Sequence, residues 1–117
     1  MNIRGPGKII TIYIGNRDQW HGQSLYNAIV QRAREMGMAG ATVTSGIEGF
    51  GANSRIHRAS LLDLSTDLPI KVEIVDREER IQQFLPELEK MVLEGLIIVR
   101  DCEIIKYVSS PGKSESV

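Results

Sequence analysis

The sequence predicts a single α+β domain in which two amphipathic helices alternate with strands in the order β-α-β-β-α-β. Its 117 residues are a usual size for one domain. Runs of β-branched residues, typical of strands, alternate with segments whose apolar residues recur every three or four positions, typical of helices. The two halves of the chain repeat the series strand, helix, glycine, strand. This is the arrangement of a ferredoxin-like domain.

The first half begins with a β-branched and aromatic run at residues 9–14, which predicts a strand that ends at Gly15. We expect a helix from about Gln23 to Met36, because apolar residues recur along one face of that segment. Gly37 is a suitable C-terminal stop, since glycine readily adopts the left-handed conformation that closes many helices. Residues 41–48 predict the second strand.

The second half begins with a candidate strand at residues 59–64, which would return beside the second strand. Residues 70–75 alternate between apolar and charged side chains, which predicts a half-buried strand. Asp76 is a suitable N-cap for a second helix that runs as far as Gly95. Pro86 should kink this helix, because proline has no N–H for the helical hydrogen bond.

Two short strands at residues 96–99 and 103–108 complete the predicted fold, the last being an extra C-terminal strand. We expect the domain itself to occupy residues 8–108. Residues 1–7 are then an N-terminal extension, and the polar residues 109–117 are a flexible tail.

The helices of such a domain cover only one face of its sheet. Strand alternation places a mixed apolar and charged set on the other face, namely Ile9, Thr11, Tyr13, Lys71, Glu73 and Val75. A sheet face with this apolar content usually finds a partner. The sequence therefore predicts a homo-oligomer.

Charge and composition limit the classes of function. With 14 basic and 15 acidic residues the net charge is −1, which argues against nonspecific binding to nucleic acid. The single cysteine, Cys102, excludes an internal disulfide framework and a cysteine zinc cluster. No apolar run reaches the roughly 18 residues that cross a bilayer. The N-terminus lacks the features of a secretory signal, so we expect a cytoplasmic protein.

The most distinctive segment is the glycine-rich stretch at residues 46–51, Gly-Ile-Glu-Gly-Phe-Gly. Glycines let successive backbone N–H groups approach a phosphate or carboxylate closely. The alternative is a glycine-rich connection or bulge that binds nothing. In the loop that follows, Arg55, His57 and Arg58 either contact an anion or a partner protein, or are solvated at the loop tip.

The sequence does not predict an enzyme. A catalytic triad needs a base beside its nucleophile, and the two histidines, His21 and His57, lie in predicted loops without one. No spacing indicates a metal site or a P-loop, so we predict no catalytic residue, metal ligand or bound cofactor. Trp20 and His21 either form a lid over a ligand or are a tryptophan that covers the core edge and a solvated histidine.

Several motifs of the chain resemble the PII-like signalling proteins. Three of them are Gly37 to Val43, the Gly-Phe-Gly at residues 49–51 before a long loop, and residues 70–75. Other motifs resemble an uncharacterised branch of PII-like proteins often encoded beside small fluoride-channel genes. They are Trp20-His21-Gly22, Leu25-Tyr26, Gly40 to Val43, Leu64 to Pro69, and Arg100 to Glu103.

The resemblance implies a compact homotrimer of ferredoxin-like protomers that binds adenine nucleotides in the clefts between its subunits. It implies that Gly40 and Thr42 line the nucleotide cleft. Gly49, Phe50 and Gly51 would then lie near the phosphate, at the base of the long loop.

The resemblance also implies that the loop at residues 49–66 changes shape with the ligand and contacts a target protein. Arg55, His57 and Arg58 lie towards its tip. A membrane channel or transporter is the kind of target that the gene neighbourhood of this branch suggests. The loop has no tyrosine like the one uridylylated in PII proteins, so that modification is not expected.

The chain departs from PII proteins at their second phosphate-binding loop. Residues 94–100 keep a single glycine and end in a lone cation, Arg100, which we include in the nucleotide site. With few N–H donors and cations for phosphate, AMP or ADP is expected rather than ATP.

Two other functions remain open. One is a metal-responsive or purely structural trimer of the same fold, in which His21, His57 or Cys102 would bind the metal. The other is a small hydrolase, which has less support because the sequence offers no base to activate a water molecule.

Overall fold

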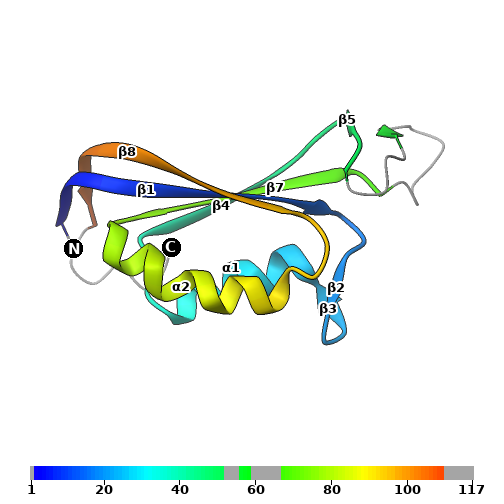
Figure 1. Cartoon of the computed structure of the whole chain (residues 1–117), viewed down its shortest axis with the longest axis horizontal. Helices are drawn as coiled ribbons and strands as arrows, with labels where there is room; N and C mark the ends of the chain where they lie inside the picture. Colours follow the sequence, from blue (N-terminus) through cyan, green and yellow to red (C-terminus); the bar gives the residue numbers. More distant parts are fainter. Residues whose placement is uncertain (1, 52–55, 59–66, 110–117) are drawn as a thin grey trace.

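The computed structural model describes residues 2–51, 56–58 and 67–109, and it has two layers (Figure 1). A four-stranded antiparallel sheet forms one layer, and two helices packed on one of its faces form the other. The predicted α+β fold class is thus confirmed. The elements in chain order are β1 (Asn2–Gly15), β2 (Gln19–Trp20), β3 (Gln23–Ser24), α1 (Leu25–Glu35), β4 (Gly40–Ser45), β5 (Glu48–Gly49), β6 (His57–Arg58), β7 (Pro69–Asp76), α2 (Glu78–Met91) and β8 (Leu96–Val108).

The strand order in the main sheet is β4-β7-β1-β8. β1 therefore has a partner on both sides, β7 over Lys8–Gly15 and β8 over Asn2–Tyr13. The two edges of the sheet are β4 and β8, which come from opposite halves of the chain. In the middle of the sheet β7 and β1 separate these two edge strands, whereas the end of β8 reaches the residues before β4.

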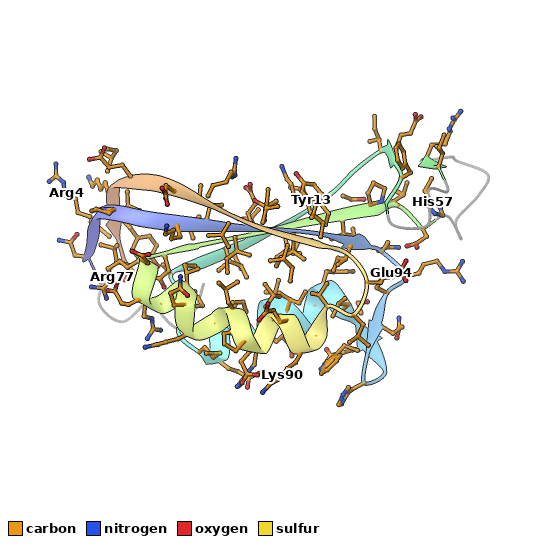
Figure 2. The ribbon with its side chains drawn as sticks, viewed as in Figure 1. Arg4, Tyr13, His57, Arg77, Lys90 and Glu94 are labelled. Atoms are coloured by element: carbon orange, nitrogen blue, oxygen red, sulfur yellow. The ribbon has the colours of Figure 1, made fainter. Side chains whose placement is uncertain are left out.

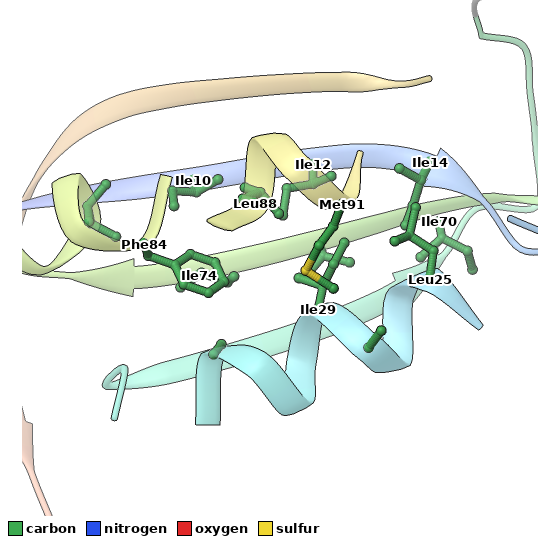
Figure 3. Close-up of a cluster of buried hydrophobic side chains, with 14 residues drawn as sticks. Ile10, Ile12, Ile14, Leu25, Ile29, Ile70, Ile74, Phe84, Leu88 and Met91 are labelled. Atoms are coloured by element: carbon green, nitrogen blue, oxygen red, sulfur yellow. The ribbon is translucent and has the colours of Figure 1, made fainter. Parts of the chain in front are cut away.

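Alternation along β1 and β7 builds the hydrophobic core against the helices (Figure 3). Every second residue of these strands is buried there, and α2 adds Phe84, which is fully buried between the layers. The core residues are Ile10, Ile12, Ile14, Leu25, Ala28, Ile29, Ala33, Ile70, Val72, Ile74, Ile81, Phe84, Leu88 and Met91. Burial of so many large aliphatic side chains, each contributing roughly 1.5–3 kcal/mol, fixes the register of the sheet against the helices.

The face of the sheet away from the helices, called the open face below, carries the predicted mixed set of side chains. Tyr13 is 42% exposed there and points away from the helices (Figure 2). Thr11 differs from the expectation, because it is only 2% exposed and its hydroxyl has no hydrogen-bond partner among the described residues.

The C-terminal region forms one strand of 13 residues rather than the two short strands predicted. The polar residues at 100–103 suggested a break, but each has a partner on β1: Arg100 lies opposite Ile9, and Asp101 opposite Lys8, with which it forms an ion pair. A long β1 makes this possible. It begins at Asn2, so residues that we expected as an N-terminal extension belong to the strand.

Both helices start or end where local hydrogen bonding differs from the predicted pattern. Helix α1 begins at Leu25 rather than Gln23, because Gln23–Ser24 pairs with Gln19–Trp20 in a small hairpin. His21 and Gly22 have φ values of 48° and 82°, as the two-residue turn of such a hairpin requires.

The N-cap of helix α2 is Arg77 and not the predicted Asp76, because Asp76 is the last residue of β7. It ends at Met91 rather than at Gly95, since Val92 already has extended backbone. Pro86 lies within the helix as predicted. The second predicted strand is divided, because β4 ends at Ser45 and Glu48–Gly49 forms the separate β5. The candidate strand at residues 59–64 lies outside the described residues.

Candidate functional site

The first part of the candidate site is the exposed edge strand β4. Gly40 lies opposite Val75 and Thr42 opposite Glu73, so both lie on the open face. Both residues are exposed. A Cβ placed on Gly40 would meet no atom within 4 Å, and its backbone is not in the left-handed region. The described part of the protomer therefore leaves free space above this glycine.

The turn before β4 is a Schellman motif, which confirms Gly37 as the stop of α1. The N–H of Gly37 donates to the Arg34 carbonyl and that of Met38 to the Ala33 carbonyl, at 3.0 Å each. Gly37 has a φ of 73°. Asp76 of β7 accepts the N–H of Ala39 at 2.9 Å. The entry to β4 is thus fixed by the fold.

The glycines after β4 have different surroundings. Cβ atoms on Gly46 and Gly49 would lie 2.8 and 3.1 Å from Cγ of Pro69, so the proline ring itself accounts for both glycines. The N–H of Gly46 also donates to the Pro69 carbonyl at 2.7 Å. Gly51 is exposed, with no atom within 4 Å of its Cβ position. Among the described residues, no neighbouring atom accounts for Gly51 as Pro69 accounts for the other two.

Residues 46–51 and 56–58 form a projection at the end of the sheet, which we call the arm (Figure 1). Within it β5 pairs with β6, and Arg58 forms an ion pair with Glu48 at 3.4 Å. Phe50 is 70% exposed. Two further apolar side chains, Ile47 and Ile56, are 79% and 57% exposed.

The three predicted partner-contact residues are Arg55, His57 and Arg58, and the structure describes two of them. His57 is half-buried on the arm (Figure 2). Arg58 forms the ion pair with Glu48 described above. Arg55 lies outside the described residues. The basic residues were predicted as partner contacts, whereas the apolar Ile47 and Ile56 were not, although both are visible in the loop sequence.

Arg100 does not join the other site residues within the protomer. It lies on β8, whereas Gly40 and Thr42 lie on β4 at the other edge. Three inter-strand spacings separate these edges, about 14 Å. Its guanidinium instead pairs with Glu73 of β7 at 3.3 Å, across β1. Sequence analysis missed Glu73 as a partner of this cation.

Asp67 is another residue that sequence analysis treated only as part of a turn. Its carboxylate accepts the N–H of Arg17 at 2.7 Å, and it lies 2.7 Å from the position of a Cβ on Gly15. The Leu68 carbonyl accepts the N–H of Asn16 at 2.8 Å. The return from the long loop is thus tied to the end of β1.

A groove of about 250 Å³ lies between α1 and α2, on the far side of the molecule from the open face. Its charged side chains neutralise one another: Arg32 pairs with Glu87 at 2.7 Å, which raises the pKa of Arg32 and lowers that of Glu87. Trp20 at one end of the groove packs against the core, and His21 stacks on it with ring centroids 4.3 Å apart. This supports the interpretation of Trp20 as a cover of the core edge.

The described ranges contain neither a cluster of metal ligands nor a helix that could span a membrane. No group of three or more histidine, cysteine, aspartate or glutamate side chains within residues 2–51, 56–58 and 67–109 is placed to hold a metal ion. Among the helices that the structure describes, none is long and apolar enough to cross a membrane.

The sheet order, the two helices on one face and the projecting arm define a ferredoxin-like fold of the PII type. The chain belongs to the DUF190 family, described as "Uncharacterized ACR, COG1993", whose model matches residues 7–104. A UPF0166 protein of Aquifex aeolicus is 38% identical over 98 residues, which are 84% of this chain and 92% of the relative. Another, MJ1524 of Methanocaldococcus jannaschii, is 37% identical over 100 residues, 85% and 92% of the two chains.

Solved structures of similar fold have lower identity. A putative PII-like signalling protein of Thermus thermophilus, TTHA0516, matches with a TM-score of 0.59 at 19% identity, over 86% of this chain and 90% of that one. CPII of Thiomonas intermedia, bound to ADP and bicarbonate, matches with a TM-score of 0.56 at 19% identity, over 85% and 88%. CutA1 of Oryza sativa matches with a TM-score of 0.55 at 13% identity, over 96% and 90%.

Proposed function

We propose that this protein is a PII-like regulatory protein whose ligand is an adenine nucleotide, AMP or ADP rather than ATP. The nucleotide binds against the open face of β4, in a cleft between the subunits of a homotrimer. Its occupancy changes the conformation of the arm and of the loop at residues 49–66, which contacts a partner protein. The protein acts in the cytoplasm, as a regulator and not as an enzyme, as its resemblance to PII-like proteins implies.

Gly40 is the observation that carries the proposal. Glycine weakens a strand, and it is normally kept there for a left-handed backbone or for the close approach of another group. Gly40 has no left-handed backbone and no neighbouring atom at its Cβ position. A group from outside the protomer, a ligand or a second subunit, accounts for the glycine. Thr42, two residues along on the same face, supplies a hydroxyl beside it.

The separation of Gly40 from Arg100 favours a site shared by two protomers. Within one chain the two residues lie on opposite edges of the sheet. If the β8 edge of one protomer lies near the β4 edge of the next, Arg100 reaches the ligand of its neighbour. The mixed open face, with Tyr13 42% exposed, supports association of this kind.

The choice of nucleotide follows from the supply of positive charge. Arg100 is one cation, and it must leave Glu73, 3.3 Å away, to contact a phosphate. The negative charge rises from AMP to ADP to ATP, so a site with one cation opposes ATP most. CPII, of the same fold, is bound to ADP in its solved structure.

The arm provides the means to transmit occupancy. Phe50 and Gly51 directly follow β5, and most of the Phe50 side chain is exposed. A ligand biases the arm only by the difference in its affinity for two arm conformations. Contacts to the backbone of Gly51 provide such a difference. We propose that the exposed Ile47, Phe50 and Ile56, together with Arg55, His57 and Arg58, contact the target, a membrane channel or transporter.

Calorimetric titration of AMP, ADP and ATP, with the mass of the protein checked by light scattering, tests this proposal. We expect about one AMP or ADP per subunit of a trimer and weaker binding of ATP. In Gly40→Val, binding should weaken at least tenfold because the side chain fills the space above β4. Its stability should be retained, since valine favours strands.

Thr44→Val is the matched control. Thr44 is exposed on the same edge strand and the same face, opposite Lys71 and four residues beyond Gly40. We expect its nucleotide affinity to match that of the wild type. A trimer that binds none of these nucleotides, or a Gly40→Val variant that binds them normally, would overturn the proposal.

A further inference from the structure

The turn that leads into β4, residues 36–40, is held by side chains from three other elements. They are Asp76 at the end of β7, Arg80 on α2 and Tyr107 near the end of β8. None of these residues belongs to the proposed nucleotide site. All three act on the backbone directly before Gly40.

Asp76 holds the turn through the N–H of Ala39. Its side chain is almost completely buried, and a buried carboxyl group is stable only with hydrogen-bond partners. One carboxylate oxygen accepts the N–H of Ala39 at 2.9 Å, and the other accepts the N–H of Arg77 at 2.7 Å. The same side chain thus ties the start of β4 to the start of α2.

Arg80 holds the two residues before Ala39. Its Nη2 donates to the Met36 carbonyl at 2.6 Å and to the Gly37 carbonyl at 2.9 Å. These carbonyls belong to the C-terminus of α1, where a cation is favoured by the helix dipole. Its Nε lies 4.0 Å from Asp76. Arg80 and Asp76 therefore support each other.

Tyr107 holds the other backbone group of Ala39, its carbonyl. Its hydroxyl donates to the Ala39 carbonyl at 2.7 Å. Ala39 therefore has its N–H bound by Asp76 and its C=O bound by Tyr107, from strands β7 and β8. With both groups fixed, the peptide that joins Ala39 to Gly40 has little freedom to rotate.

We propose that Asp76, Arg80 and Tyr107 are positioning residues for the nucleotide site. They hold the Ala39–Gly40 peptide in its bound orientation before the ligand arrives, so that binding does not have to order this wall. Tyr107 in addition makes the site sensitive to the position of the end of β8. The inference rests on the proposed function.

Tyr107→Phe tests the inference, because it removes one hydroxyl and keeps the ring. We expect the Kd for ADP to rise about three- to tenfold, the range of one lost hydrogen bond, with the number of sites and the trimer mass unchanged. Amide exchange at Ala39 to Ala41 should become faster. Tyr26→Phe is the control: its ring packs against the core, and its hydroxyl has no hydrogen bond within the part of the chain that the structure describes.

A role in stability alone would lower the melting temperature and leave the Kd for ADP unchanged, which would overturn the inference. Asp76→Asn provides a second variant, since an amide accepts only one of the two N–H groups, and we expect a larger rise in Kd. If the wild type binds no adenine nucleotide, the proposed function fails. Amide exchange in Tyr107→Phe then still decides whether this hydroxyl fixes the turn, and unchanged exchange would reject that as well.

Discussion

The two ends of β4 are built differently. At the N-terminal end, Asp76, Arg80 and Tyr107 fix the backbone before Gly40 by hydrogen bonds from three elements. At the C-terminal end, a backbone hydrogen bond from Gly46 and the nearby ring of Pro69 hold the first residue of the arm. The buried Asp76 and the half-buried Arg80 and Tyr107 hold the first end, and exposed apolar side chains dominate beyond the second.

This difference suits a protein that senses a ligand and reports it. A fixed wall gives affinity, because the ligand does not have to order it. A segment with few buried contacts opens at low free energy, and such segments supply the parts of proteins that move. In our proposal one edge strand connects both, with the nucleotide between them.

The largest expected effect is at the fixed end. Asp76→Ala leaves the N–H groups of Ala39 and Arg77 without this partner in a part-buried site, and we expect the free energy of unfolding to fall by about 2 kcal/mol. Urea denaturation measures it. Asp101→Ala is the control, since this exposed carboxylate pairs with Lys8 alone among the described residues and should leave the urea midpoint unchanged. Equal midpoints for the two variants would contradict the importance given to the fixed end.

A smaller effect is expected where β4 meets the arm. In Gly46→Ala the new Cβ would lie 2.8 Å from Cγ of Pro69, and the ring cannot yield easily, so we expect a loss of about 1–2 kcal/mol. In Gly51→Ala nothing lies within 4 Å, and stability should match the wild type. Differential scanning calorimetry distinguishes the two. Equal losses would mean that Pro69 does not set the position of the arm.

Much of the fold was predictable because its signals are local. Alternation in residues 70–75 and the glycine at 37 report on burial and backbone within a few positions, and both expectations are confirmed. The single long β8 was missed, since its polar residues 100–103 are stabilised by pairing with β1, about ninety residues away in the sequence. Local polarity cannot reveal a partner at that distance.

The same limit explains what could be predicted of the site. The glycine-rich stretch was recognised, but the sequence does not show that Pro69 accounts for Gly46 and Gly49 while Gly51 is unconstrained. Nor does it show that Arg100 and Gly40 lie on opposite edges, which depends on the strand order. The assignment of a nucleotide site to Gly40, Thr42, Gly49, Phe50, Gly51 and Arg100 stays a prediction.

Hydrogen exchange of the protein with and without saturating ADP tests the central claim most directly. The account predicts that ADP slows exchange across the arm, at residues 46–51 and 56–58. Exchange at residues 37–41 should change little, because the wall is already fixed. Bound ADP that leaves exchange in the arm unchanged would contradict the account, since occupancy would then not reach the segment proposed to report it.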